Sequence, residues 1–280
     1  MIIALFVNAT KQQSEPLVNN VLEFFSSQGI SVVMEKEQAK EFGVQEISSV
    51  EFTNIAFLIS MGGDGTILQL VHKYPHLSAP ILGINLGHLG FMADVPTSDI
   101  YPSLQDLLQG AYKVEERLVI EGMTTHQEKC FAVNDIVIHR ARNPSLIELA
   151  IHVDGLYVNT FEADGIIVST PNGSTAYSLA AGGPILSPTL DALVLTPISA
   201  HTISNRPIVL TAHQTIQIQY LSHYDPVEVR ADGMDQFFLK TEEIFTIHRS
   251  TSQIFRLVNL FRRDYFSTLR TKLGWAGKLR

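Results

Sequence analysis

The spacing of hydrophobic residues divides the chain into two regions with different periods. Over residues 1–112, short runs that are apolar throughout, such as 2–7 and 55–59, alternate with segments whose apolar residues recur every three or four positions. Continuously apolar short runs are typical of strands buried on both faces. The three-to-four period over 15–26 is typical of a helix with one buried stripe. Alternation of this kind predicts an α/β domain with a mostly parallel sheet.

After residue 112 the period changes to two. Residues 146–153 alternate between the faces of an expected strand, and Asp154-Gly155 is a strong signal for a two-residue hairpin turn. Similar stretches lie at 193–198, 208–210, 215–220, 227–231 and 243–248. We therefore predict a second, all-β domain over 113–253. The last segment, 254–280, contains a helical pattern at 264–273 and is predicted to pack back on the first domain.

The composition indicates a globular protein. A chain of 280 residues that is 45% hydrophobic and 17% charged can bury a full core. Its net charge of −8 argues against nucleic acid as the main partner but permits a small anionic ligand at one electropositive loop. The single cysteine, Cys130, excludes an intramolecular disulfide and suits a reducing compartment. With no run of 18 apolar residues and no basic leader, we expect a cytoplasmic protein without a membrane span.

The strongest signal for chemistry is the segment 60–66, Ser-Met-Gly-Gly-Asp-Gly-Thr, between an expected strand and a helix expected over 66–74. Its glycines let the backbone turn tightly and approach a ligand, and the N-terminus of a helix favours phosphate. The segment is neither a Walker A motif nor a dinucleotide-binding Gly-x-Gly-x-x-Gly motif. The alternative is a plain turn with Asp64 as the helix cap. The predicted phosphate loop consists of Gly62, Gly63, Gly65 and Thr66.

Two further segments contain adjacent polar and glycine residues beside apolar runs. The segment 85–91, Asn-Leu-Gly-His-Leu-Gly-Phe, follows an expected strand at 81–84, and the carboxyl ends of strands are where open α/β sheets bind ligands. Phe91 can stack on a base or pack in the core. The pair Asn134-Asp135 interrupts the apolar run 131–138. We interpret this run as one strand, in which one residue of the pair faces each side of the sheet, so that only one of them is expected to meet a ligand directly.

The segment 163–185 is dense in glycines and small hydroxyl residues. Such a density suits the recognition of ribose hydroxyls and amides, with Asp164 as an acceptor. The alternative is a Ser/Thr turn that leads into a helix at Thr175.

Together these segments resemble the NAD kinase family. Gly-Gly-Asp-Gly is shared with diacylglycerol-type lipid kinases and 6-phosphofructokinases. The Asn-x-Gly-x-Leu-Gly-Phe segment, the Asn-Asp pair and the block Ser-Thr-Pro-x-Gly-Ser-Thr-Ala-Tyr at 169–177 are more specific, and they occur in the order found in the family. The segment 264–275 also looks like the ending of bacterial members. The likeness runs from about residue 55 to the C-terminus.

The resemblance implies transfer of a phosphoryl group from ATP or polyphosphate to the adenosine ribose 2′-hydroxyl of NAD, which gives NADP, with a divalent metal such as Mg²⁺. It also implies that the second domain is sandwich-like, and that NAD lies in a cleft of a homodimer or homotetramer. At matching positions, Asp64 is the base that accepts the hydroxyl proton, which agrees with the chemistry of a weak nucleophile. The implied NAD contacts are Asp64, Gly65, Phe91, Asn134, Asp135, Asp164, Thr175, Ala176, Tyr177, Ser178 and Ala180.

Some positions depart from the family pattern, and other functions stay open. Glu162 stands where a basic residue is common, Met234 where glutamine is common, and Asn172 where Thr or Ser is frequent. No obvious Asp or Glu cluster marks the metal, which the donor phosphates can hold. The alternatives are a lipid or small-molecule kinase, which the pair Asn134-Asp135 disfavours, and a non-catalytic sensor of NAD or NADP, which Asp64 disfavours.

Overall fold

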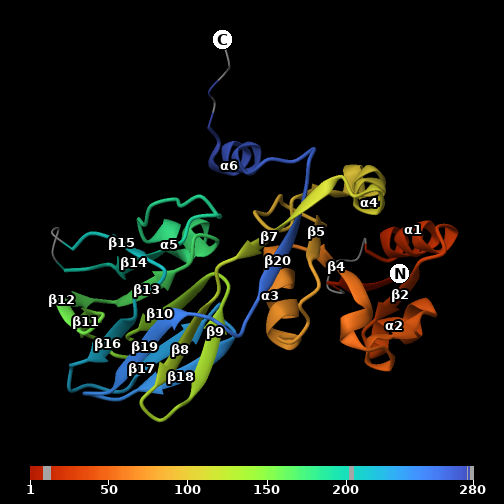
Figure 1. Ribbon diagram of the computed structural model, residues 1–280. Helices are drawn as coiled ribbons and strands as arrows, with labels where there is room; N and C mark the ends of the chain where they lie inside the picture. Colours follow the sequence, from red (N-terminus) through yellow and green to blue (C-terminus); the bar gives the residue numbers. More distant parts are fainter. Residues whose placement is uncertain (9–13, 202–204, 276, 278–280) are drawn as a thin grey trace. The chain divides into compact units, whose positions relative to one another are not determined.

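The computed structural model describes residues 1–8, 14–201, 205–275 and 277, and the chain divides into two compact units. The first unit comprises Met1–Glu116 and Arg256–Arg280, and the second comprises Arg117–Phe255. The predicted fold class is confirmed, because one unit is α/β with a mostly parallel sheet and the other is built of antiparallel strands. Figure 1 shows the chain path, with the last strand and the last helix in blue.

An eight-stranded sheet forms the centre of the first unit. Its order is β3-β2-β1-β4-β5-β20-β7, with β6 paired to β5, and the pairs among β1 to β6 and between β5 and β20 are parallel. The C-terminal segment therefore returns to this unit as a strand of its sheet. The strands are β1 (Ile2–Val7), β2 (Ser31–Met34), β3 (Gln45–Glu46), β4 (Ile55–Gly62), β5 (Ile81–Asn85), β6 (Val95–Pro96), β7 (Tyr112–Arg117) and β20 (Phe255–Leu260).

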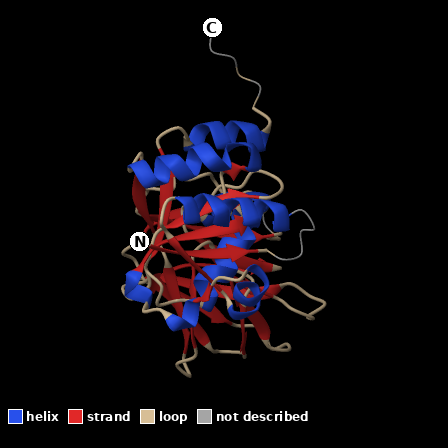
Figure 2. Ribbon diagram, turned by 90° about the vertical axis from the view of Figure 1, so that its right-hand side faces the viewer, coloured by secondary structure: helices blue, strands red, loops and turns tan. Residues whose placement is uncertain are grey.

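Helices cover this sheet, as Figure 2 shows with helices in blue and strands in red. They are α1 (Ser14–Ser27), α2 (Lys36–Phe42), α3 (Asp64–Lys73) and α4 (Ile100–Gln109), and a further helix, α6 (Tyr265–Leu273), lies against the loop that follows β5. Both α4 and α6 end at a glycine in the left-handed region, Gly110 and Gly274, which relieves the Cβ clash of that conformation. Helix α2 was not predicted, because Ala39 is its one buried residue and no apolar stripe marks it.

The core of the first unit combines strand and helix residues. Ile3 and Leu5 on β1 and Ile59 on β4 are fully buried, and Val21 and Phe25 on α1 pack in the same cluster. Each fully buried aliphatic or aromatic side chain of this kind stabilises the fold by about 1.5–3 kcal/mol relative to exposure. The continuous apolar runs of the sequence are thus strands covered on both faces.

The second unit consists of two six-stranded antiparallel sheets. One sheet has the order β15-β14-β13-β10-β17-β18 and the other β12-β11-β16-β19-β8-β9. The strands of the first are β10 (Asp135–His139), β13 (Gly165–Ser169), β14 (Ala192–Ile198), β15 (Ile208–Thr211), β17 (Val227–Ala231) and β18 (Asp235–Leu239). The strands of the second are β8 (Ile120–Thr124), β9 (Lys129–Ala132), β11 (Ile147–Val153), β12 (Leu156–Ala163), β16 (Ile216–Tyr220) and β19 (Ile244–Arg249).

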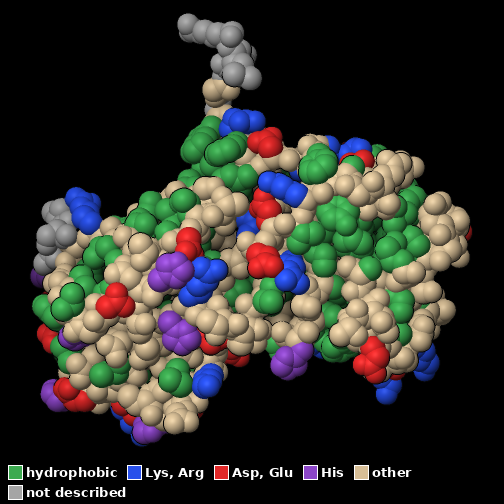
Figure 3. Space-filling model, viewed as in Figure 1, with side chains coloured by type: hydrophobic (Ala, Val, Ile, Leu, Met, Phe, Trp, Pro, Cys, Tyr) green, Lys and Arg blue, Asp and Glu red, His purple; other side chains and the backbone are tan. Residues whose placement is uncertain are grey.

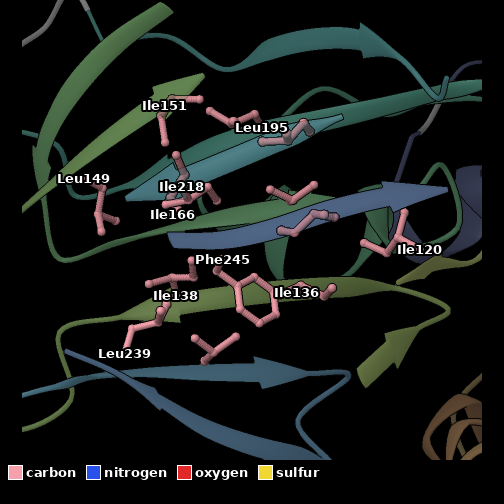
Figure 4. Close-up of a cluster of buried hydrophobic side chains, with 14 of the residues drawn as sticks. Ile120, Ile136, Ile138, Leu149, Ile151, Ile166, Leu195, Ile218, Leu239 and Phe245 are labelled. Atoms are coloured by element: carbon pink, nitrogen blue, oxygen red, sulfur yellow. The ribbon is translucent and has the colours of Figure 1, made fainter. Parts of the chain in front are cut away.

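One hydrophobic cluster joins residues of both sheets, which makes the second unit a sandwich. Figure 4 shows Ile136, Ile138 and Ile166 of one sheet with Ile218 and Phe245 of the other. The predicted hairpin turn has Asp154 at φ 52° and Gly155 at φ 78°, with Val153 paired to Leu156, which is the geometry that an Asp-Gly hairpin favours.

The apolar run 131–138 is not one strand, which corrects the expectation for Asn134-Asp135. Strand β9 ends at Ala132 in one sheet, and β10 begins at Asp135 in the other. Asn134 therefore lies between two strands, and the argument that the pair faces opposite sides of one sheet does not apply.

Candidate active site

The Gly-Gly-Asp-Gly loop joins β4 directly to α3. Strand β4 ends at Gly62, Gly63 is the N-cap of α3 in an extended conformation, and the helix begins at Asp64, two residues before the predicted start. The Gly63 N–H donates to Thr66 Oγ1 at 3.3 Å. The loop thus places the first turn of a ten-residue helix, with its electropositive N-terminus, at the carboxyl end of a buried strand.

The glycines of this loop differ in what the fold requires of them. A Cβ at Gly62 would lie 2.2 Å from Thr66 Oγ1, so packing alone explains that glycine. At Gly63 and Gly65, a Cβ would meet no described atom within 4 Å other than those of its chain neighbours and of the α3 backbone, and neither residue has a φ in the left-handed region. Packing and backbone strain therefore do not account for glycine at 63 and 65, and the absence of side chains there leaves the backbone open to a ligand.

Asp64 does not cap its own helix, so the alternative of a plain capped turn is wrong for its side chain. Its carboxylate instead accepts three backbone hydrogen bonds from a loop 27 to 29 residues away. The Phe91 N–H donates to Oδ2 at 2.8 Å, and the N–H groups of Met92 and Ala93 donate to Oδ1 at 3.0 and 2.9 Å. A carboxylate has about four acceptor positions, so the half-buried Asp64 keeps one on Oδ2.

The loop that holds Asp64 is built by the second sequence motif. Asn85, buried at the end of β5, donates through Nδ2 to the carbonyls of His88 and Ala93 and accepts the Gly87 N–H at 2.6 Å. A Cβ at Gly90 would lie 2.0 Å from Asp64 Oδ1, so glycine is required there. We call residues 85–93 the carboxylate-binding loop. The structure thus brings together Asp64, Gly65 and Phe91 in the first unit.

The second unit contains a cavity of about 400 Å³. Of the residues predicted to bind NAD, Asn134, Asp135, Ala176 and Tyr177 line it. No sequence pattern marked the rest of the lining as binding residues, although the alternation over 227–231 predicted a strand there. The missed residues are Val137, His139, Glu228, Arg230, Asp232 and Gly233.

Asp232 holds the backbone at this cavity as Asp64 does in the first unit. Its carboxylate accepts the N–H groups of Val133 at 2.8 Å, Asn134 at 2.7 Å and Asp135 at 3.1 Å. These bonds replace ladder bonds at the point where the chain passes from β9 to β10, which explains why no continuous strand forms there.

Asp135 is a buried acid on the cavity wall, with 7% of its surface exposed. Burial, together with the nearby carboxylate of Asp232, raises its pKa to about 7. The Asp135 carboxyl therefore changes its charge near neutral pH.

Several hydroxyls of the segment 163–185 form hydrogen bonds within the protein. Thr170, Ser174 and Ser178 are fully buried. Thr170 Oγ1 donates to the Val133 carbonyl at 2.6 Å, Ser174 Oγ donates to the Pro171 carbonyl at 2.7 Å, and Ser178 Oγ bonds to Thr196 Oγ1 at 3.0 Å. The expected helix at Thr175 is a 3-10 turn, Gly173–Thr175, followed by a short helix α5, Tyr177–Ala180.

The remaining predicted contacts lie outside the lining of this cavity. Thr175 Oγ1 donates to the Asn172 carbonyl at 3.2 Å, and Ala180 is exposed. Asp164 forms an ion pair with Arg140, with 2.7 Å between Oδ1 and Nε. Asn172 Nδ2 donates to Asn134 Oδ1 at 2.7 Å, so this segment orients the amide of Asn134.

In the described part of the chain, no three His, Cys, Asp or Glu side chains gather as a metal site would require. The described side chains thus form no group that could by itself ligate a hard divalent cation.

None of the described helices combines the length and apolarity needed to cross a membrane.

Comparison with known proteins gives one consistent answer. The profile of the ATP-NAD kinase N-terminal domain matches residues 3–112, and that of the ATP-NAD kinase C-terminal domain matches residues 133–260. An NAD kinase of Protochlamydia amoebophila is 57% identical over 279 residues, covering 99% of each chain. An NAD kinase of Moorella thermoacetica is 35% identical, covering 98% of this chain and 90% of its own.

Two solved structures resemble the whole fold. A crystal structure of an NAD kinase from Archaeoglobus fulgidus in complex with ATP has a TM-score of 0.79 at 25% identity, covering 99% of this chain and 100% of its own. A crystal structure of yeast NADH kinase complexed with NADH has a TM-score of 0.88 at 24% identity, covering 100% of this chain and 89% of its own, and supports the fold alone.

Proposed function

This chain belongs to the NAD kinase family, and we propose that Asp64 is the base of its reaction. The enzyme phosphorylates NAD to NADP with ATP as a donor. In this reaction the 2′-oxygen of the adenosine ribose forms a bond to the γ-phosphorus of ATP. The bond from that phosphorus to the β,γ-bridging oxygen breaks, and ADP leaves. The hydroxyl proton passes to the Asp64 carboxylate.

The observation that carries this proposal is how Asp64 is held. Three backbone N–H groups fix both of its oxygens, and an acceptor position remains on Oδ2. A carboxylate that is already oriented gives a substrate hydroxyl one place to donate its hydrogen. Positioning of this kind is the main contribution a protein makes to phosphoryl transfer, whose transition state is loose. We therefore assign proton acceptance to Oδ2.

Gly63, Gly65 and the first turn of α3 suit the transferred phosphate. The open space at both glycines allows the backbone to approach phosphate oxygens, and the N–H groups of a helix N-terminus are donors to anions. Bound Mg²⁺ would neutralise charge on these oxygens. Because the described residues hold no metal cage, we propose that Mg²⁺ enters on the donor phosphates.

The cavity of the second unit suits the adenosine part of NAD. Its wall offers the carboxyl of Asp135, the amide of Asn134 and the exposed ring of Tyr177, which can bind amino groups and a base face. We propose that Asp164, Thr175, Ser178 and Ala180 also contribute to NAD binding, with the buried Ser178 acting through its bond to Thr196.

We further propose that the protein is cytoplasmic, that it forms a homodimer or homotetramer, and that it has no nucleic-acid partner.

One assay tests the activity against the other functions. The purified chain is incubated with Mg²⁺, ATP labelled in its γ-phosphoryl group, and either NAD or diacylglycerol; polyphosphate replaces ATP in a parallel reaction. We expect label in NADP and none in lipid. Label in the lipid alone would favour a lipid kinase. Binding of NAD seen by calorimetry, without any product, would mean a sensor.

A further inference from the structure

The C-terminal helix α6 contacts the carboxylate-binding loop through two residues on one face. Tyr265 and Lys272 are seven positions apart, which is two helical turns. The Tyr265 ring centroid lies 6.0 Å from that of Phe91, and Lys272 Nζ lies 5.0 Å from the Phe91 ring centroid. Lys272 Nζ also donates to the Leu89 carbonyl at 2.9 Å. The helix therefore holds the loop at a ring and at its backbone.

The helix itself is well anchored in the first unit. Asp264 caps it by accepting the Ser267 N–H at 2.9 Å, and Leu269 is buried. The segment before it is tied to the region of α4, because Arg262 pairs with Asp106 and Arg263 pairs with Asp99. In Figure 3, hydrophobic, basic and acidic side chains lie together where Figure 1 draws α6. The Lys272 side chain thus extends from a helix whose position is fixed.

The contacts form a short chain that ends at the proposed base. Lys272 binds the Leu89 carbonyl, Gly90 follows without room for a side chain, and the next three N–H groups bind the Asp64 carboxylate. We propose that Lys272 is a positioning residue for phosphoryl transfer, because it fixes the loop that orients Asp64. The proposal rests on the proposed role of Asp64 as the base. The proposal also gives the C-terminal segment a part in the reaction. The contacts described above join this segment to one predicted site residue, Phe91.

The size of the effect follows from geometry rather than from the strength of one exposed bond. Lys272 is exposed, so its loss should hardly change the stability of the fold. A shift of about 1 Å in a reacting group can nevertheless cost on the order of 100-fold in rate. A partial loosening of the loop should therefore lower kcat roughly tenfold while the melting temperature stays within about 2 °C.

The test compares Lys272→Met with Arg270→Met in the full chain. Arg270 is an exposed basic residue in the same last turn of α6 and serves as the matched control. Steady-state kinetics give kcat and KM for ATP, and hydrogen exchange measures the amides of residues 86–93. We expect K272M to lower kcat roughly tenfold with KM for ATP within about twofold, and to speed exchange at 91–93 about threefold or more. R270M should match the wild type in both measurements.

Each other outcome overturns the proposal in a recognisable way. Faster exchange with an unchanged kcat would mean that Lys272 holds the loop without serving the reaction. A lower kcat with unchanged exchange would rule out action through the loop. If the wild-type chain makes no NADP at all, the proposed function itself fails, and the exchange result still shows whether Lys272 fixes residues 91–93.

Discussion

The two units contain the same hydrogen-bonding device, used for different ends. In the first unit, Asp64 accepts three successive backbone N–H groups, and in the second unit Asp232 does the same. Around Asp64 lie glycines with open space and no structural need to be glycine. Beside Asp232 lies another acid, Asp135, whose pKa is raised to about 7 by burial and by the Asp232 carboxylate. In our proposal, the first device orients a carboxylate for reaction, and the second fixes a backbone turn and a group that recognises NAD.

This comparison shows that a hydrogen-bond pattern does not by itself define a role. Both aspartates stabilise the meeting of two distant segments, and both have the acceptor capacity of a carboxylate. What separates them is the space next to the carboxylate and the charge of its neighbours. Each aspartate can be changed by one isosteric substitution, and the two changes should affect different kinetic quantities.

Replacing Asp64 should have the largest effect. In Asp64→Asn the side chain loses the proton acceptor and presents an NH₂ donor, so it cannot accept all three N–H groups. We expect kcat for NADP formation to fall about 10²–10⁴-fold, the usual contribution of a general base. Glu41→Gln, an exposed acid on α2, is the control. A D64N protein with turnover within tenfold of the wild type would reject Asp64 as the base.

Asp135 should make stability depend on pH. Its pKa in the fold, about 7, is higher than the ordinary 3.8, so the folded protein keeps a proton that the unfolded chain has lost. Its stabilising contribution is fully present below about pH 3.8 and is lost as the pH rises to about 7, on the order of a few kcal/mol. Denaturation at several pH values should show this slope in the wild type and not in Asp135→Asn. Parallel slopes in the two proteins would disprove it.

Replacing Asp232 should have the smallest effect and a different signature. Asp232→Asn removes a charge beside Asp135 and leaves at most two of the three accepted N–H bonds, at a cost of about 1–3 kcal/mol in stability. We expect KM for NAD to rise roughly tenfold, since about 1.4 kcal/mol of binding is a factor of ten, with kcat within about threefold. The pKa of Asp135 should fall yet stay above its ordinary value, because burial remains. A collapse of kcat with an unchanged KM would erase the distinction between the two aspartates.

Local patterns were enough to predict the elements that form within one stretch of chain. The turn at Asp154-Gly155 depends on two residues that tolerate positive φ. The Gly-Gly-Asp-Gly loop lies where a strand meets a helix, as expected. Helix α2 was not predicted, because Ala39 is its one buried residue and its sequence has no apolar stripe.

The parts that could not be predicted depend on contacts between distant segments. Asp232 binds residues 97 to 99 positions away, and neither segment signals the other. The sequence does not show that the hydroxyls of Ser174 and Ser178 are buried and bonded within the protein, Ser174 to the Pro171 carbonyl and Ser178 to Thr196 on β14. The family resemblance supplied site residues that no local pattern could place.

A complex with NAD and a non-hydrolysable ATP analogue tests the central claim most directly. The decisive quantity is the distance from Asp64 Oδ2 to the 2′-oxygen of the adenosine ribose. We predict a hydrogen bond of about 2.6–3.2 Å, directly or through one water, with the Phe91, Met92 and Ala93 N–H groups still on the carboxylate. A ribose bound beyond the reach of Asp64, with no bridging water, would contradict the account.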